Sequence, residues 1–470
     1  MTSRARQPNL MVMPLLTALS ELLGQGGVLA APEDRAPFER DWRGLAQNPA
    51  LAVAFPKTTE QVSEIVKLCT AHNVAIVPQG GNTGLVAGGV PIAGRDQLIL
   101  SFNRMGQIRN LDLAANCVVA EAGVTLARLR EAAAESGRLF PVSFAADGSA
   151  QIGGAISTNA GGVQVLSYGN MRAQVLGLEV VLADGTIWHG LNALPKDNTG
   201  YDLKQLFIGA EGTLGLITAA CLRLHPAPRA VATALVGVGS AADAMALFQA
   251  VRASAGPALT LCEFMTDDAI HLGGTPPFKA PTYLLLEVSA LEEDAAPQLL
   301  IERALEEAMA EGTALDAVSA QSSQQRKMLM GLREAIPEGE LHAGGAVKHD
   351  ISVPLSRMAE MVVATETLIA RDFPSCRLNI FGHLGDGNLH INIRPPEGKA
   401  LADLNKPAIT SAVERLAVQL GGSFSAEHGI GQFRLAGMAA HKSPVALSMM
   451  RRLKTAFDPA GLLNPGKTIP

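Results

Sequence analysis

Two histidines and a glutamate in the last third of the chain have the residue types of a metal-binding site. They are His383, His390 and Glu427, and Glu427 is followed directly by His428. Two imidazoles and one carboxylate suit zinc in an open, catalytic coordination sphere, and manganese or iron less well. A lone histidine is more often a structural, hydrogen-bonded side chain, but the clustering of these groups with Asn392 favours a site.

A short strand is expected to position the second of these histidines. After a turn at 386–387, polar and apolar residues alternate from 388 to 393 with a period of two. Asn388, His390 and Asn392 should therefore share one face of that strand. Asp386, in the turn, is interpreted as a turn residue only.

Glu427 and His428 lie in a segment flanked by glycines. Adjacent residues of a regular strand point to opposite faces. Both side chains can therefore serve one site only if Gly429 and Gly431 mark an irregular turn.

The first half of the chain contains glycine-rich segments of the kind that bind phosphate. Residues 77–85 follow an apolar run and include Gly80, Gly81 and Gly84. Glycine allows positive φ and brings bare backbone N–H groups close to an anion. Taken alone, the segment is more often a tight connecting loop, since such turns are common.

Three further glycine-rich segments favour an extended ligand over a chance turn. They span residues 148–154, 159–162 and 208–215. None has the GxGxxG pattern after a strand, and GxxxxGK followed by Ser or Thr does not occur, so neither a Rossmann site nor a P-loop is indicated. A large dinucleotide bound in another way is the remaining option.

The composition is typical of a globular enzyme that acts on small molecules. The chain has 470 residues, of which 48% are hydrophobic, and a formal net charge of -6. This charge gives no reason to expect a nucleic acid or an anionic membrane as partner. The five cysteines are scattered without CxxC spacing, which argues against a disulfide framework, an iron–sulfur cluster or a covalently attached haem and fits a reducing cytoplasm.

The N-terminal region is interpreted as a surface helix. The apolar stretch from Leu10 to Leu23 is interrupted at amphipathic spacing by Thr17, Ser20 and Glu21, unlike a signal peptide. The sequence has no run of about 18 apolar residues. We therefore expect no transmembrane segment and at most a peripheral association with a membrane.

The pattern of periodicities predicts an α+β fold. Short Val/Ile/Leu runs alternate with glycine-rich turns up to about Pro226, and longer Ala/Leu/Glu helical stretches appear beyond it. We expect helices at 59–72, 126–137, 241–253 and 295–311, and strands at 74–77, 97–101, 178–182 and 283–288. The predicted units are an N-terminal helical segment (1–47), a nucleotide-binding domain (48–228), a substrate or cap domain (229–425) and a C-terminal segment (426–470).

Two long strings carry a family resemblance. Residues 198–215 (NTGYDLKQLFIGAEGTLG) and 464–467 (NPGK) resemble segments of the FAD-linked dehydrogenases of the vanillyl-alcohol oxidase superfamily. The similarity runs from about residue 56 to residue 467. It implies a two-part FAD-binding domain, an antiparallel-sheet cap domain and a helical C-terminal region that returns to the flavin.

The resemblance also implies which residues bind the cofactor. These are Pro78, Gly80, Gly81, Asn82, Thr83, Gly84, Leu85, Ser149, Gly153, Gly154, Asn159, Gly161, Gly162, Gly212, Ile217 and Asn464. Members with a covalent flavin often use a histidine in the first glycine loop. Because that loop offers only Gln79, Asn82 and Thr83, we expect non-covalent FAD.

The last third is similar to the D-2-hydroxyglutarate and D-lactate dehydrogenase branch of this superfamily. The resemblance implies that the divalent metal, which we predict to be zinc, is held by His383, His390 and Glu427, and that His428 is the catalytic base.

Two cations are expected to bind an acidic substrate, together with Asn392 and His428. Arg333 and Lys348 match carboxylate-binding residues of the branch. Either residue is ordinarily a solvated surface charge. An arginine can grip a carboxylate with two hydrogen bonds, and a lysine adds a point charge.

The branch implies metal-assisted oxidation of a D-2-hydroxy acid to the 2-oxo acid by hydride transfer to flavin N5, with D-2-hydroxyglutarate as the first candidate substrate. D-lactate or glycolate as substrate, an oxidase, and a non-catalytic flavin-binding subunit of a glycolate-type complex are the alternatives. Pro337 stands where glutarate-specific relatives tend to have a threonine, so one donor for a second carboxylate is missing. Electrons should leave to a separate acceptor, an electron-transfer flavoprotein or a quinone, and a homodimer is left open.

Overall fold

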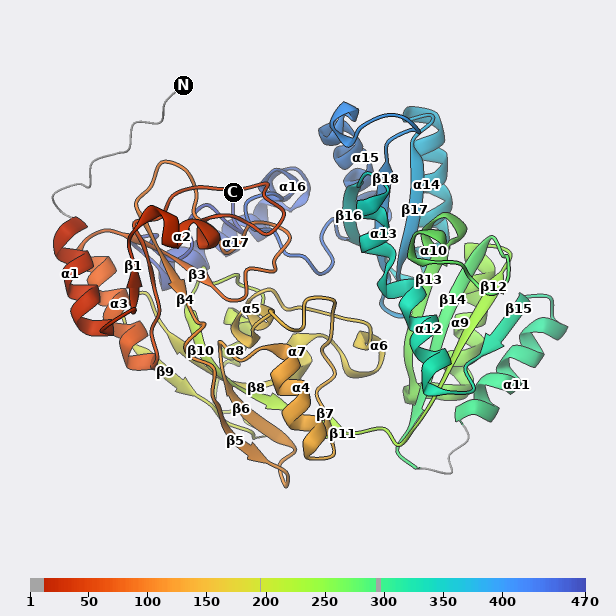
Figure 1. Cartoon of the computed structure of the whole chain (residues 1–470), viewed down its shortest axis with the longest axis horizontal. Coiled ribbons are helices and arrows are strands. Elements are labelled where there is room, and N and C mark those ends of the chain that lie inside the picture. The colour runs from red at the N-terminus through yellow and green to blue at the C-terminus, as the bar shows by residue number, and fades with distance from the viewer. Residues whose placement is uncertain (1–11, 195, 293–296) are drawn as a thin grey trace.

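The computed structural model describes residues 12–194, 196–292 and 297–470, and its elements form two lobes (Figure 1). The first lobe contains the chain up to about residue 226 together with the last two helices. The second lobe contains the segment between them. The predicted α+β architecture is confirmed, with an antiparallel sheet in the second lobe and a helical C-terminal region that returns to the first.

A mainly parallel sheet of four strands forms one part of the first lobe. In order across the sheet, the strands are β1 (Val28–Leu29), β2 (Ala52–Ala54), β4 (Gln97–Ser101) and β3 (Ala75–Gln79). Helices α1 (Val12–Leu23), α2 (Pro32–Glu39) and α3 (Thr59–Ala71) accompany it. The amphipathic stretch near the N-terminus is α1, which buries Leu15 and Leu19 in a core shared with α3.

A five-stranded antiparallel sheet forms the other part of this lobe. Its order is β5 (Ile108–Asp112), β6 (Cys117–Glu121), β10 (Leu216–Arg223), β8 (Val175–Val181) and β9 (Ile187–Gly190). Its helices are α4 (Leu126–Glu135), α5 (Ile152–Ser157), α6 (Val165–Tyr168), α7 (Met171–Gln174) and α8 (Lys204–Phe207). Two further short strands, β7 (Arg138–Leu139) and β11 (His225–Pro226), pair with each other. The glycine-rich segments follow β3, precede and follow α5, and precede β10.

The second lobe is one seven-stranded antiparallel sheet. Its order is β15 (Ala314–Ser319), β12 (Ala230–Val238), β14 (Thr282–Ala290), β13 (Leu259–Thr266), β17 (Arg377–His383), β18 (Asn388–Arg394) and β16 (Val347–Ser352). One face carries α9 (Ala241–Ala255), α11 (Pro297–Ala310), α14 (Met358–Asp372) and α15 (Lys406–Gln419). The other carries α10 (Asp267–Gly273), α12 (Ser323–Glu334) and α13 (Ile336–His342).

Burial on both faces explains the continuous apolar run of β14. Leu284, Leu286 and Val288 lie in the core under one layer of helices, whereas Tyr283 and Leu285 lie in the core under the other. Because alternate side chains of a strand point to opposite faces, a sheet covered on both sides needs apolar residues at nearly every position.

The C-terminal segment packs against the first lobe (Figure 1) through α16 (Leu435–His441) and α17 (Pro444–Phe457). The Phe457 ring meets the Phe207 ring edge to face at 5.8 Å. Beyond α17 the chain runs beside β3, where the Asn464 N–H donates to the Ile76 carbonyl at 2.8 Å. The end of the chain is thereby brought to the glycine loop that follows β3.

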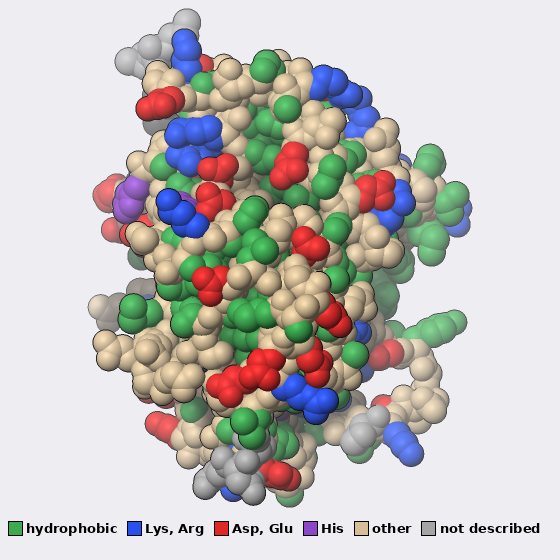
Figure 2. All heavy atoms as spheres, turned by 90° about the vertical axis from the view of Figure 1, so that its right-hand side faces the viewer, with side chains coloured by type: hydrophobic (Ala, Val, Ile, Leu, Met, Phe, Trp, Pro, Cys, Tyr) green, Lys and Arg blue, Asp and Glu red, His purple; other side chains and the backbone are tan. Residues whose placement is uncertain are grey.

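The surface of the second lobe has no single sign of charge in the view of Figure 2. Acidic and basic side chains are interspersed over that face, with apolar side chains between them. Within the described residues, no helix is both long and apolar enough to cross a membrane.

Candidate active site

A cavity in the first lobe is lined by the glycine-rich segments. Of the residues predicted to bind the cofactor, those in its lining are Pro78, Gly80, Gly81, Asn82, Thr83, Gly84, Gly153, Gly154, Gly212, Ile217 and Asn464. Five predicted residues lie outside the lining, namely Leu85, Ser149, Asn159, Gly161 and Gly162. The lining also includes two charged or ionisable groups that were not predicted for it, Glu211 and His428.

Two of the lining glycines are needed for close packing of the loops. A Cβ at Gly81 would collide with the Ser149 carbonyl, so these two glycine-rich segments are in close contact at this point. Gly212 has a φ of +70°, and a Cβ there would lie 2.5 Å from Pro78 Cγ. The loops can approach one another, and a bound anion, only because these side chains are absent.

The predicted metal ligands lie together at the face of the second lobe that meets this cavity. His383 ends β17, His390 lies on β18, and Glu427 belongs to the active-site loop, which we define as residues 425–431. One donor atom of each of the three lies within 4.8 Å of the others, and His383 Nε2 is 3.8 Å from Glu427 Oε2. A second such group consists of Asp350, His390 and His428.

Sheet register and loop geometry bring these residues together. His390 pairs with Phe381 of β17 on one side and with Asp350 of β16 on the other. The active-site loop is irregular, with a φ of +78° at Gly429 and +47° at Gly431. Such a backbone lets neighbouring side chains reach one site, which a regular strand would prevent.

His383 is held by a buried acid that the sequence did not point out. Its Nδ1 meets Glu263 of β13, and Arg333 Nε donates to the same carboxylate at 2.5 Å. Burial alone would raise the pKa of Glu263, but His383 and Arg333 lower it to about 2. Burial opposes protonation of His383, yet Glu263 raises the pKa of His383 to about 9. With Nδ1 turned to Glu263, the Nε2 atom of His383 faces the cluster, as in carboxylate–histidine–metal arrangements.

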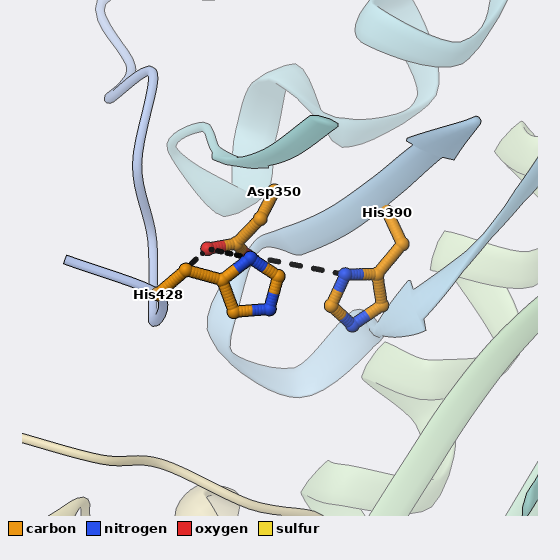
Figure 3. Close-up of side chains that lie close together, drawn as sticks. All are labelled: Asp350, His390 and His428. Carbon is orange, nitrogen blue, oxygen red and sulfur yellow. Dashed lines mark hydrogen bonds and ion pairs between the residues drawn. The ribbon is translucent and has the colours of Figure 1, made fainter. Parts of the chain in front are cut away.

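Asp350 is a second buried carboxylate that was missed. Figure 3 shows it between two imidazoles, with His390 on the neighbouring strand and His428 on the loop. Its Oδ1 is 3.9 Å from His390 Nδ1, and its Oδ2 is 3.5 Å from His428 Nδ1. Burial would raise the pKa of Asp350, but the two histidines and the backbone N–H groups of the loop hold it well below its usual value. Burial lowers the pKa of His428, which favours a neutral imidazole able to accept a proton.

The group of His383, His390 and Glu427 fits a divalent cation better than the group around Asp350. Burial, together with nearby acids including Asp350, raises the pKa of Glu427 to about 7, although His383 acts to lower it. Its carboxylate accepts no hydrogen bond from the described residues, whereas Asp350 Oδ1 already accepts one and Asp350 Oδ2 accepts two. A desolvated carboxylate beside two imidazoles is the environment that a bound cation would stabilise.

The predicted substrate cations are both close to acids. Arg333 stacks over the Phe381 ring at 4.6 Å, and its two terminal nitrogens donate to no residue within the described ranges. Lys348 Nζ lies 2.7 Å from Glu340, a buried acid that also accepts from Asn392 Nδ2 at 2.8 Å. The structure therefore leaves the fork of Arg333 available to a carboxylate, while Lys348 and Asn392 share a partner.

A glycine beside Glu427 offers a test of this cluster. A Cβ at Gly161 would collide with Glu427 Oε1. We expect Gly161→Ala to push the carboxylate out of place and weaken Zn²⁺ binding by about 10–100-fold, measured by competition with a chelating dye. Gly148→Ala is the control, because a Cβ there would meet nothing within 4 Å. Equal affinity in both variants would contradict a metal site that depends on the present position of the Glu427 carboxylate.

Two protein families match the chain in succession. The FAD binding domain family matches residues 50–190, and the family described as FAD linked oxidases, C-terminal domain, matches residues 227–468. The first match contains the glycine loop after β3, and the second contains the proposed metal ligands.

Similar proteins agree with these matches. The protein named D-2-hydroxyglutarate dehydrogenase, mitochondrial, of Bos taurus is 39% identical over 97% of this chain and 83% of its own length. The D-2-hydroxyglutarate dehydrogenase of Stutzerimonas stutzeri is 37% identical over 96% of this chain and 98% of its own. A solved structure of p-cresol methylhydroxylase with substrate bound has a TM-score of 0.75 at 18% identity, over 97% of this chain and 96% of that one, which shows a shared fold. The chain therefore belongs to the FAD-linked oxidase family, in its D-2-hydroxyglutarate dehydrogenase-like branch, and is an FAD-dependent oxidoreductase.

Proposed function

We propose that this chain oxidises D-2-hydroxyglutarate to 2-oxoglutarate, with FAD in the glycine-lined cavity and a divalent metal, zinc, held by His383, His390 and Glu427. The observation that carries the proposal is the position of His428. It lines the cofactor cavity and also follows directly after one of the three clustered ligands. The names of the relatives support the choice of substrate.

The protein residues divide the work of binding and proton transfer. When bound, FAD supplies the acceptor for the hydride on C2, and the divalent cation supplies Lewis acidity at the substrate hydroxyl. Arg333 and Lys348 hold the substrate carboxylate, with Asn392 beside Lys348. His428 takes the hydroxyl proton, for which a neutral imidazole near the cavity is suited.

Binding of FAD is proposed to be non-covalent. Covalent flavins are attached through side chains such as histidine, and His428 is the one imidazole among the described residues that line the cavity. That imidazole has another task in the mechanism. We propose an electron-transfer flavoprotein or a quinone as the electron acceptor. We also propose a cytoplasmic location, with any membrane contact peripheral, which the scattered cysteines support.

Oxidation of a smaller 2-hydroxy acid is the second candidate function, and one residue near the proposed substrate-binding Arg333 favours it. Pro337 is the second residue of the short helix α13, four residues after Arg333, and has no N–H to donate. D-lactate and glycolate, which lack a distal carboxylate, would not need that donor.

An anaerobic substrate panel tests the proposal and separates these candidates. The yellow FAD-loaded protein is mixed with D-2-hydroxyglutarate, D-lactate, D-malate, glycolate or L-2-hydroxyglutarate, and loss of flavin absorbance is followed. We expect D-2-hydroxyglutarate to bleach the flavin fastest and its L-enantiomer not at all. Faster bleaching by D-lactate or glycolate would make that acid the proposed substrate in place of D-2-hydroxyglutarate. If none of these acids reduces the flavin, the proposed oxidation of a small 2-hydroxy acid is wrong, and a non-catalytic flavin-binding subunit becomes the favoured alternative.

A further inference from the structure

A buried glutamate of the first lobe holds one half of the active-site loop. Glu211 Oε1 accepts the backbone N–H of Ile430, and its Oε2 accepts that of Gly431, each at 2.7 Å. Glu211 is 7% exposed and lies in the loop that precedes β10, so these bonds join segments about 220 residues apart in sequence. Glu211 also lines the cofactor cavity.

The other half of the loop is held from the second lobe. Asp350 Oδ2 accepts the backbone N–H of Glu427 at 2.8 Å and that of His428 at 2.9 Å. Two buried carboxylates, one from each lobe, thus accept four N–H groups of the loop that carries a proposed metal ligand and the proposed base. Each N–H that points at a carboxylate forms a charge-assisted bond, which is stronger than a neutral one.

The backbone of Glu211 is itself in an unusual conformation. Its φ is +51°, in the left-handed region that a glutamate seldom adopts. Asn464 Nδ2 donates to the Glu211 carbonyl at 2.7 Å and so supports this conformation. A strained residue that is kept in place by its surroundings often serves a function.

The loop has no side chain where the carboxylate approaches it. A Cβ at Gly429 would lie 2.9 Å from Glu211 Oε1, and the φ of +78° at Gly429 also favours glycine. Burial raises the pKa of Glu211, while the two N–H donors and the Lys467 charge act to lower it. The site is therefore built to accept two N–H groups with one side chain.

We propose that Glu211 is a positioning residue for the reaction: by binding the active-site loop to the flavin-binding lobe, it sets where His428 and Glu427 lie relative to the cofactor cavity. This inference rests on the proposed function for the roles of those two residues. The hydrogen bonds themselves do not depend on that function.

Glu211→Gln tests the positioning role without changing the size of the side chain, because the amide keeps the shape of the carboxylate. A carboxylate has an acceptor oxygen for each N–H, whereas the amide offers one oxygen and places an NH₂ group against the other N–H. We expect amides of the active-site loop to exchange with deuterium faster in this variant. We also expect Zn²⁺ affinity and the rate constant for anaerobic flavin reduction at saturating D-2-hydroxyglutarate each to fall by about 10–100-fold.

Glu121→Gln is the matched control. Glu121 is also 7% exposed, accepts the Gln107 N–H at 2.9 Å and pairs with Arg109 at 3.2 Å, but it is not a lining residue and its side chain accepts no hydrogen bond from the loop. This variant should lose thermal stability without changing loop exchange, Zn²⁺ affinity or the reduction rate. Loop exchange and Zn²⁺ affinity within twofold of wild type in Glu211→Gln would overturn the proposal.

Two further outcomes are decided by the same measurements. If Glu211→Gln does not retain FAD, amide exchange and Zn²⁺ affinity are compared between the full wild-type and variant chains, both freed of FAD. Equal values overturn the proposal. Faster exchange of the loop and weaker Zn²⁺ binding in the variant support it. If wild type is not reduced by any hydroxy acid, the proposed function fails. Loop exchange then still decides whether Glu211 holds the loop.

Discussion

Replacing His428 by alanine is expected to slow flavin reduction by D-2-hydroxyglutarate by about 10²–10⁴-fold, the usual contribution of a positioned general base. The variant should still bind FAD, because most of the cavity lining comes from the glycine loops and their backbone. The reduction rate is measured by anaerobic stopped-flow absorbance at saturating substrate, and FAD content by absorbance of the purified protein.

His271→Ala is the control for the loss of an imidazole. His271 lies on α10, with an exposed side chain that pairs only with Asp267 of its own helix among the described residues. It should reduce its flavin at the wild-type rate. A His428→Ala protein that is also reduced at the wild-type rate would remove His428 from the mechanism and leave the base to another group.

Replacing Glu427 by glutamine is expected to weaken Zn²⁺ binding by at least about 10²-fold, since even indirect partners of a metal site contribute 10–100-fold. The amide carries no charge and cannot balance a divalent cation between two imidazoles. Turnover should fall in parallel and recover in part at high Zn²⁺, while FAD stays bound. Metal content is measured by mass spectrometry after dialysis.

Glu360→Gln removes a charge from the exposed surface of α14 and should leave metal content unchanged. The comparison also decides between the two clusters of potential ligands. If Glu427→Gln keeps its metal and Asp350→Asn loses it, the cation lies with Asp350, His390 and His428, and His428 is a ligand and not the base.

Most of the regular elements were predictable because they follow from local periodicity. The strand predicted at 97–101 is β4 at the same bounds, and the helix predicted at 59–72 is α3 at Thr59–Ala71. The strand predicted at 74–77 begins one residue later and extends through Pro78 to Gln79, because β3 continues its parallel pairing with β4 up to the glycine loop. Pro78 has no N–H to donate to a neighbouring strand. It is tolerated in β3 because β3 is at the edge of its sheet.

The supporting acids of the site were not predictable in the same way. The period of two that placed His390 and Asn392 on one face of β18 also applies to Lys348 and Asp350 of β16, so Asp350 carried a signal that was available. Glu263 is the one charged residue of β13, which is a weaker signal. Its contact with His383 depends on the pairing of β13 with β17, about 120 residues apart, and no local pattern reveals that pairing.

The position of the metal relative to the flavin tests the account most directly. Crystals of the FAD-loaded protein soaked in Zn²⁺ would be measured at the zinc absorption edge. We predict one anomalous peak bounded by His383, His390 and Glu427, with the flavin ring in the glycine-lined cavity next to His428. A peak bounded by Asp350, His390 and His428 instead, or a flavin ring remote from His428, would contradict it.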